Sequence, residues 1–141
     1  MARHSRQRAN LRIERGLPFV SLEIGWQQAA LTLRSVLLDT GSASTVLAVD
    51  NVEPLGIRLE QEDPINRIVG VGGGEFVFCK RIPWLALGPC RALDMPVELG
   101  ALDYGFPIDG ILGLDFMRQV GLVIDLGQLR ARCCAERIGF R

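Results

Sequence analysis

The sequence is poor in the side chains that build metal sites. Its one histidine is His4, and its four cysteines, Cys79, Cys90, Cys133 and Cys134, show no CxxC spacing of the kind that zinc sites use. We therefore expect no metal and no other cofactor. We interpret the cysteines as reduced thiols, which are typical of a cytoplasmic protein, and a disulfide or metal role for them is the alternative.

An excess of charge of one sign is also missing. The 141 residues carry 16 basic and 16 acidic side chains, and this balance argues against a nucleic-acid-binding protein. No segment approaches the ~18 uninterrupted apolar residues of a transmembrane helix. The early apolar stretch is broken by Pro18 and Glu23, so it does not resemble a signal peptide. We expect neither a nucleic-acid partner nor a membrane segment.

The positive charge is nevertheless uneven, because five arginines lie within the first fifteen residues. We expect residues 1–16 to form a flexible basic arm and residues 17–141 to form a single folded domain. An arm that docks on a partner or on an acidic surface is the alternative interpretation.

Long helical patterns are scarce, and short strand-like runs separated by turn residues dominate. Alternating runs at 18–25 and 27–39 predict a hairpin, and those at 65–69 and 75–82 predict a second hairpin around glycines 70–74. A third hairpin is expected to close around Gly127 and Gln128. Residues 115–120 suit one short helix, and the segment 44–59 suits a short helix or an irregular loop. The pattern predicts an all-β, barrel-like domain with one short helix.

The stretch "SVLLDTGSASTVL", residues 35–47, places Asp39 directly after an apolar run. An ionised carboxylate at the end of a buried strand loses solvation, so it needs hydrogen-bond donors around it. Gly41 permits close approach of the chain, and Thr40 and Ser42 supply hydroxyls. The segment therefore suits the presentation of a carboxylate, although an ordinary strand-to-loop turn has the same composition.

Three features follow one another along the chain: the Asp-Thr-Gly turn, the glycine-tipped hairpin and the segment "DGILGLDF" at 109–116. This ordered set resembles the retropepsin-like aspartic proteases over roughly residues 19–135. The resemblance implies a closed-barrel-like acid-protease lobe with a flap hairpin, which works as a homodimer on polypeptide substrates.

The resemblance also implies roles for individual residues. Asp39 matches the catalytic aspartate, and Thr40, Gly41 and Ser42 match residues that support the active site. The implied flap comprises Val69, Gly70, Val71, Gly72 and Gly73, and the implied substrate pocket comprises Ile111, Leu112 and Gly113.

The chain departs from the family in three places, and one is the segment "ERIGFR" at 136–141, which extends past the strand that usually ends the family's chain and forms the dimer. Retroviral members pair an acidic residue after the Asp-Thr-Gly turn with an arginine after the apolar-Gly segment, whereas this sequence has Ala43 and Leu114 there. We expect an apolar contact to replace that ion pair. The one tyrosine, Tyr104, lies outside the hairpin, so the flap tyrosine of pepsin has no counterpart.

Peptide hydrolysis without a metal or a covalent intermediate needs one group to activate water and another to protonate the product. Two carboxylates that share a proton meet both needs. The chain contains Asp-Thr-Gly once, and we interpret Asp109 as a turn residue and Asp115 as a helix-capping residue. The second carboxylate should then be Asp39 of a second subunit.

These expectations describe an aspartic endopeptidase that activates water with Asp39 and cuts extended polypeptides at a site shared by two identical subunits. The alternative is a catalytically inactive dimer of the same fold that binds peptides or serves as a scaffold.

Overall fold

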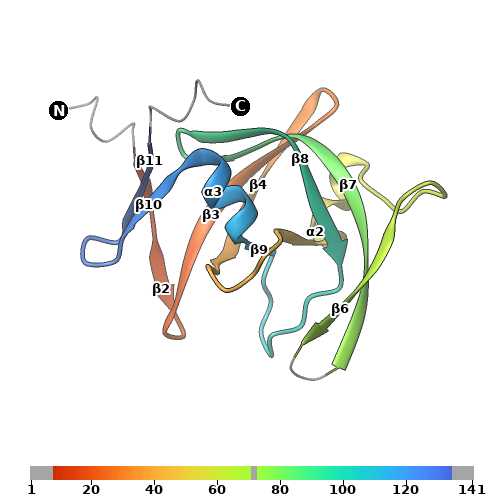
Figure 1. Ribbon diagram of the computed structural model, residues 1–141, viewed down its shortest axis with the longest axis horizontal. Helices are drawn as coiled ribbons and strands as arrows, with labels where there is room; N and C mark the ends of the chain where they lie inside the picture. The colour runs from red at the N-terminus through yellow and green to blue at the C-terminus, as the bar shows by residue number, and fades with distance from the viewer. Residues whose placement is uncertain (1–7, 71–72, 135–141) are drawn as a thin grey trace.

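The fold is built almost entirely from β-strands (Figure 1). The computed structural model describes residues 8–70 and 73–134. In chain order its elements are β1 (Arg8–Asn10), β2 (Arg12–Glu14), β3 (Leu17–Trp26), β4 (Ala29–Leu38), β5 (Val46–Ala48), α2 (Val49–Val52), the 3-10 helix η1 (Glu53–Leu55), β6 (Ile65–Gly70), β7 (Gly73–Leu87), β8 (Cys90–Gly100), β9 (Gly110–Leu112), α3 (Leu114–Val120), β10 (Leu122–Asp125) and β11 (Arg130–Cys133).

Six of these strands close into a barrel. The order β3-β4-β9-β5-β8-β7 returns to its start because β3 pairs with β4 along one edge and with β7 along the other. β2 extends this sheet from β3 and β6 extends it from β7, while β1, β11 and β10 form a separate three-stranded sheet. The predicted all-β, barrel-like fold is therefore confirmed.

The helices differ slightly from the prediction. The expected short helix at 115–120 is present as α3. A second one, α2, lies in the segment where a short helix or an irregular loop was expected, so the count of one helix was too low. None of the helices among the described residues has the length and apolar character needed to cross a membrane.

The main hydrophobic core fills the inside of the barrel. Leu22 and Ile24 from β3, Leu47 from β5 and Leu99 from β8 are fully buried there, and Phe116 of α3 packs with them. On β3 these buried positions alternate with exposed Ser21 and Glu23, because successive side chains of a strand point to opposite faces.

Three hairpins that were predicted from local patterning are present. β3 pairs with β4, β6 with β7, and β10 with β11, each in antiparallel register. In the glycine-rich hairpin Gly70 pairs with Gly73, and residues 71–72 lie outside the described residues.

The expected flexible arm is wrong for residues 8–14. Residues 8–10 pair with β11 and residues 12–14 pair with β3, so this part of the chain belongs to the sheets. The physical reason is that buried Ala9 and Leu11 alternate with exposed Arg8 and Asn10, which is the period-2 pattern of a strand. The density of arginines concealed that pattern.

Lys80 is a buried cation on β7. Its ammonium group forms ion pairs with Glu60 and with Asp63, at 2.8 Å from the Asp63 carboxylate. Burial alone would lower the pKa of Lys80, but the hydrogen bonds to the two carboxylates outweigh it and raise the pKa. The Lys80 hydrogen bond in turn lowers the pKa of Asp63. The pairs therefore fasten the loop between η1 and β6 to the barrel.

Asp63→Asn should weaken this attachment. Because the folded-state pKa of Asp63 is depressed, its contribution to stability is present above the unfolded pKa of about 3.9 and is lost as the pH falls through the folded value. The substitution should lower the free energy of unfolding at pH 7 and flatten its decline in acid. Urea denaturation from pH 7 to pH 2 measures both effects, with exposed Asp50→Asn as the control. If the free energy of unfolding of Asp63→Asn fell as steeply in acid as that of the wild type, the stabilising role of the Asp63–Lys80 ion pair would be contradicted.

Candidate active site

Asp39 lies immediately after β4, where the chain leaves the barrel. Its backbone N–H donates to the carbonyl of Leu112, 3.0 Å away, so the β4–β9 pairing continues to this residue. Leu38 points into the main core, whereas Leu37 belongs to a second apolar cluster outside it. Since side chains alternate along a strand, Asp39 shares the outer face with Leu37. The carboxylate is therefore partly exposed, on the outside of the barrel.

The residues after Asp39 form a tight turn around its carboxylate. The N–H of Gly41 donates to Oδ1 of Asp39 at 2.9 Å, and the N–H of Ser42 donates to the Asp39 carbonyl at 3.2 Å. A β-carbon on Gly41 would lie 3.2 Å from that Oδ1, so a side chain there would crowd the carboxylate. Thr40 and Gly41 are exposed beside it. The turn brings Asp39, Thr40, Gly41 and Ser42 together as the sequence predicted.

Gly113 packs directly against this turn. A β-carbon on Gly113 would lie 2.4 Å from the carbonyl oxygen of Ser44 and 3.0 Å from that of Ser42, so only glycine fits. The adjacent Leu114 N–H donates to the Ser42 carbonyl at 2.7 Å. This backbone bond joins the two segments at the position where retroviral relatives have an ion pair. Leu114 and Ala43 are exposed, so the expected apolar contact is not what holds the segments together.

Thr45 and Asp115 form a polar link that the sequence did not reveal. The fully buried Thr45 donates its hydroxyl to Oδ1 of Asp115 at 2.8 Å and its N–H to Oδ2 at 3.1 Å. The same hydroxyl accepts the Gly113 N–H at 3.0 Å. Asp115 lies in the first turn of α3, as expected for a residue at the start of a helix, and its Oδ1 accepts the Phe116 N–H at 2.7 Å, while Gly113 occupies the N-cap position itself. Nothing in the local sequence marks Thr45, because its partner is distant along the chain.

Asp109 holds the other side of the turn in place. Its carboxylate accepts the Ser35 N–H at 2.9 Å and the Asn51 side-chain amide at 2.5 Å. Its backbone also bonds to Ser35 and to Ala48, each at 2.8 Å. Asp109 therefore connects β4, the end of β5 and α2, which is more than the turn role we expected. The carboxylates of Asp109 and Asp115 are both committed to structural hydrogen bonds.

The predicted pocket residues occupy different surroundings. Leu112 is fully buried in the main core, so its side chain lies inside the barrel. Ile111 is 6% exposed and belongs to the outer cluster with Phe19, Leu37 and Ile108. Of the apolar pair, Ile111 is the one on the same face as Asp39.

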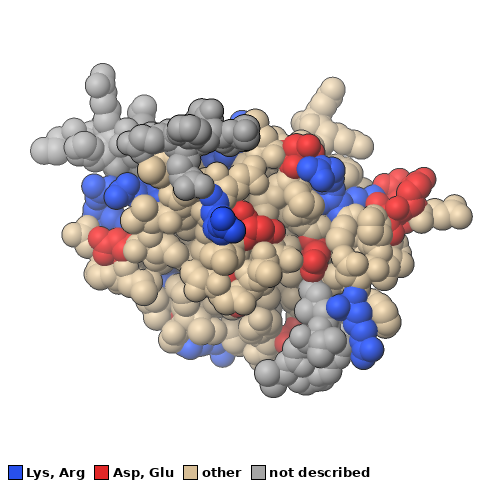
Figure 2. Space-filling view, in the orientation of Figure 1, with Lys and Arg blue, Asp and Glu red and all other residues tan. Residues whose placement is uncertain are grey.

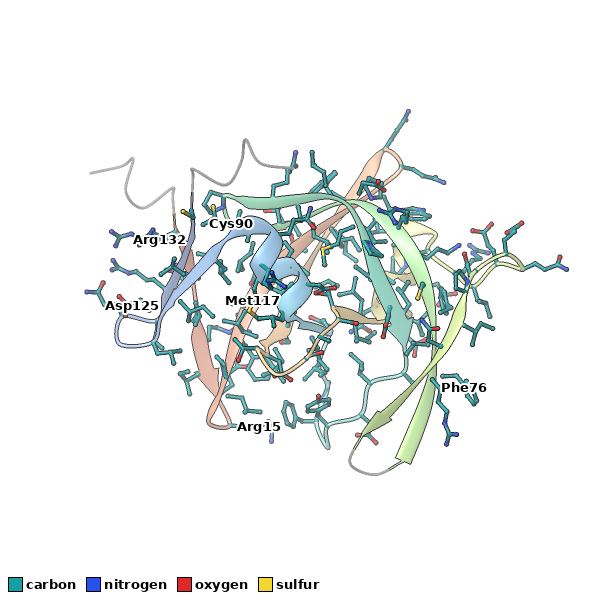
Figure 3. The ribbon with its side chains drawn as sticks, in the orientation of Figure 1. Arg15, Phe76, Cys90, Met117, Asp125 and Arg132 are labelled. Carbon is teal, nitrogen blue, oxygen red and sulfur yellow. The ribbon has the colours of Figure 1, made fainter. Side chains whose placement is uncertain are left out.

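The loop between β8 and β9 reaches back toward Asp39. Phe106 packs edge-to-face on Phe19 at 6.1 Å and on Tyr104 at 6.5 Å, and the Arg15 guanidinium lies 4.5 Å above the Phe106 ring. Figure 3 shows Arg15 at the turn between β2 and β3. Partial burial, and then the negative charge of Asp39, raises the pKa of Tyr104. The aromatic contacts therefore place the tyrosine within electrostatic reach of the carboxylate.

The β6–β7 hairpin ends on the same half of the barrel as the Asp39 turn and the β8–β9 loop, toward the lower side of Figure 1. Of the predicted flap residues, Val69, Gly70 and Gly73 lie at the ends of its strands, and Val71 and Gly72 lie outside the described residues. Phe76, on β7, is 70% exposed and points away from the barrel (Figure 3).

The surface around the barrel carries mixed charge. Figure 2 shows basic and acidic side chains in small interspersed groups on the visible face. Within residues 8–70 and 73–134, no group of three or more histidine, cysteine, aspartate or glutamate side chains is arranged to hold a metal ion. The chemistry that the described site offers is that of a supported, partly exposed carboxylate beside apolar and aromatic side chains.

Comparison with known proteins agrees with this geometry. A family model described as aspartyl protease matches residues 27–116, which include the Asp39 turn, both strands of the glycine-rich hairpin and β9. A search of curated proteins found no significant match.

Gly113→Ala should loosen the Asp39 turn, because the added methyl group meets the Ser44 carbonyl and neither backbone can yield without breaking hydrogen bonds. We expect the free energy of unfolding to fall by about 1–3 kcal/mol. Urea denaturation measures the change. Gly127→Ala is the matched control, because its β-carbon would meet only Oδ1 of Asp125 at 3.4 Å. Equal stability of the two variants would contradict the close packing at Gly113.

Proposed function

Since the chain belongs to the retropepsin-like aspartyl protease family, we propose that it is a homodimeric aspartic endopeptidase in which each subunit contributes one Asp39 to a shared active site. The observation that carries the proposal is the Asp39 turn. It presents a carboxylate on the outer face of the barrel, and that carboxylate accepts the backbone N–H of Gly41.

In the proposed reaction the two Asp39 carboxylates share one proton. Two like charges a few ångströms apart resist simultaneous ionisation, so one carboxylate stays protonated while the other is ionised. The ionised group removes a proton from water, which attacks the peptide carbonyl, and the protonated group donates to the carbonyl oxygen. Transfer of a proton to the leaving nitrogen then completes hydrolysis.

The need for a second subunit follows from how the other nearby acids are used. Asp109 bonds to Ser35 and Asn51, and Asp115 bonds to Thr45, so both are occupied in holding the turn. A two-fold axis beside exposed Thr40 would bring the two Asp39 side chains together through a self-complementary interface. Thr40 then stabilises the paired turns from below, and Gly41 contacts the substrate backbone.

The proposed substrate is an extended polypeptide. Its backbone pairs with the β6–β7 hairpins, which act as flaps, in the manner of an added strand. Ile111 forms a wall that receives the side chains next to the cut bond, and Gly113 keeps the catalytic turn in place beside it. Apolar side chains are preferred at those positions. The alternative of an inactive peptide-binding dimer is decided by the first experiment below.

Asp39→Asn should abolish cleavage, because an amide cannot serve as the general base. We expect kcat/KM on an unfolded protein substrate at mildly acidic pH to fall by roughly 10²–10⁴-fold or more. A melting curve and a sedimentation profile that match the wild type would show that the fold and the dimer persist. Equal activity of the two proteins, or inactivity of both on a diverse peptide library, would favour the non-catalytic module.

The shared site also predicts a concentration dependence. Specific activity should fall on dilution through the dimer dissociation constant, because monomers hold one carboxylate each. A tenfold excess of Asp39→Asn subunits should reduce the activity of a fixed amount of wild type to about a tenth if subunits pair at random. Sedimentation on the same samples gives the dimer fraction. Constant activity per mole in a demonstrated monomer range would rule out the shared site.

A further inference from the structure

One row of side chains crosses the outer face of the barrel from strand to strand. Residues paired in register on neighbouring strands point to the same face of a sheet, so the register alone defines this row. Its members, one from each of β3, β4, β9, β5, β8 and β7, are Phe19, Leu37, Ile111, Val46, Glu98 and Cys79.

The row begins beside the Asp39 turn with apolar side chains and continues into polar ones. Phe19, Leu37 and Ile111 belong to the apolar cluster on the Asp39 face, and Val46 is also buried, outside the main core. Glu98 then interrupts the apolar series with a carboxylate. The charge of Glu98 acts on Cys79, whose pKa is raised by burial and then by this neighbour.

The Glu98 side chain is half-buried, and one of its two carboxylate oxygens lacks a partner. Its Oε2 is buried and receives no hydrogen bond from any group that the structure describes. The two cations next to Cys79 on β7 are already engaged, since Lys80 pairs with Glu60 and Asp63, and Arg81 pairs with Asp94. A carboxylate oxygen that is removed from water without a partner is costly to the fold, so its presence on the active-site face points to a cation supplied from outside the chain.

We propose that Glu98 selects a lysine or arginine side chain of the substrate, in a subsite separated from the cut bond by the apolar part of the row. This inference rests on the proposed protease function. Glu98 accepts the charged head of such a side chain in a charge-assisted hydrogen bond.

The spacing of the strands sets the position of this subsite. Three strand-to-strand steps separate Leu37 from Glu98, which is about 14 Å. An extended peptide advances about 3.3 Å per residue, so the basic side chain belongs about four residues from the cut bond, on one side or the other. The substrate is then apolar at the cut and basic farther along.

A positional peptide library tests this directly. The wild-type protein should prefer lysine or arginine over norleucine at one such position. Glu98→Gln should reduce kcat/KM for the lysine peptide by roughly 10- to 100-fold, because a charge-assisted bond is lost. Cleavage of the norleucine peptide should stay within about threefold. Glu23→Gln, which removes an exposed carboxylate of β3, is the control and should keep the basic preference.

Two outcomes would overturn the role of Glu98 while leaving the protease function intact. One is wild-type cleavage without any basic preference. The other is a Glu98→Gln variant that fails to lose the preference. Such a variant could weaken only dimerisation, which is the result expected if a cation of the partner subunit occupies the site. If the wild type cleaves nothing, the protease proposal fails. Peptide binding by two variants, Asp39→Asn and Asp39→Asn/Glu98→Gln, then tests the preference for a basic side chain separately. If neither variant prefers the lysine peptide, or if both do, the role of Glu98 is overturned.

Discussion

The contact between Gly113 and the backbone of residues 42–44 is the constraint on which the site depends. It brings the start of α3 against the turn that carries Asp39, at a distance that admits no side chain. The hydrogen bonds of Leu114 to Ser42 and of Thr45 to Asp115 are possible only at this close approach. The carboxylate is therefore held by a rigid junction of two chain segments, which is the kind of support that a catalytic group requires.

The residues that form the core and the residues that form the candidate site lie on opposite faces of the barrel strands. The interior of the barrel is filled mainly by apolar side chains such as Leu38, Leu112 and Phe116. Alternation along the same strands places Leu37, Asp39 and Ile111 outside. Each strand near the site thus contributes to the core and to the site through successive residues, and a shift of register by one residue would exchange the two faces.

Local patterns in the sequence were enough to predict the all-β fold, three hairpins, α3 and the turn at Asp39, since each is encoded within about twenty residues. The features that the sequence concealed join distant segments. Thr45 and Asp115 are 70 positions apart, and Ser35 and Asp109 are 74 apart. The local sequence does not distinguish Glu98 from any other acidic residue of a strand. Glu98 becomes distinctive only when the barrel aligns β8 with β5 and β7.

Asp39 and Glu98 illustrate two ways of keeping a carboxylate on one apolar face. Asp39 is solvated in part and supported by the Gly41 N–H, so it remains available for proton transfer. Glu98 has a buried oxygen without a described donor, and its proposed role is to bind a cation, about 14 Å along the row from Leu37. The buried apolar residues Ile111 and Val46 lie between them in the row. Under the proposed function, the outer face has a reactive end at Asp39 and a selective end at Glu98, and an extended peptide is a ligand long enough to span both.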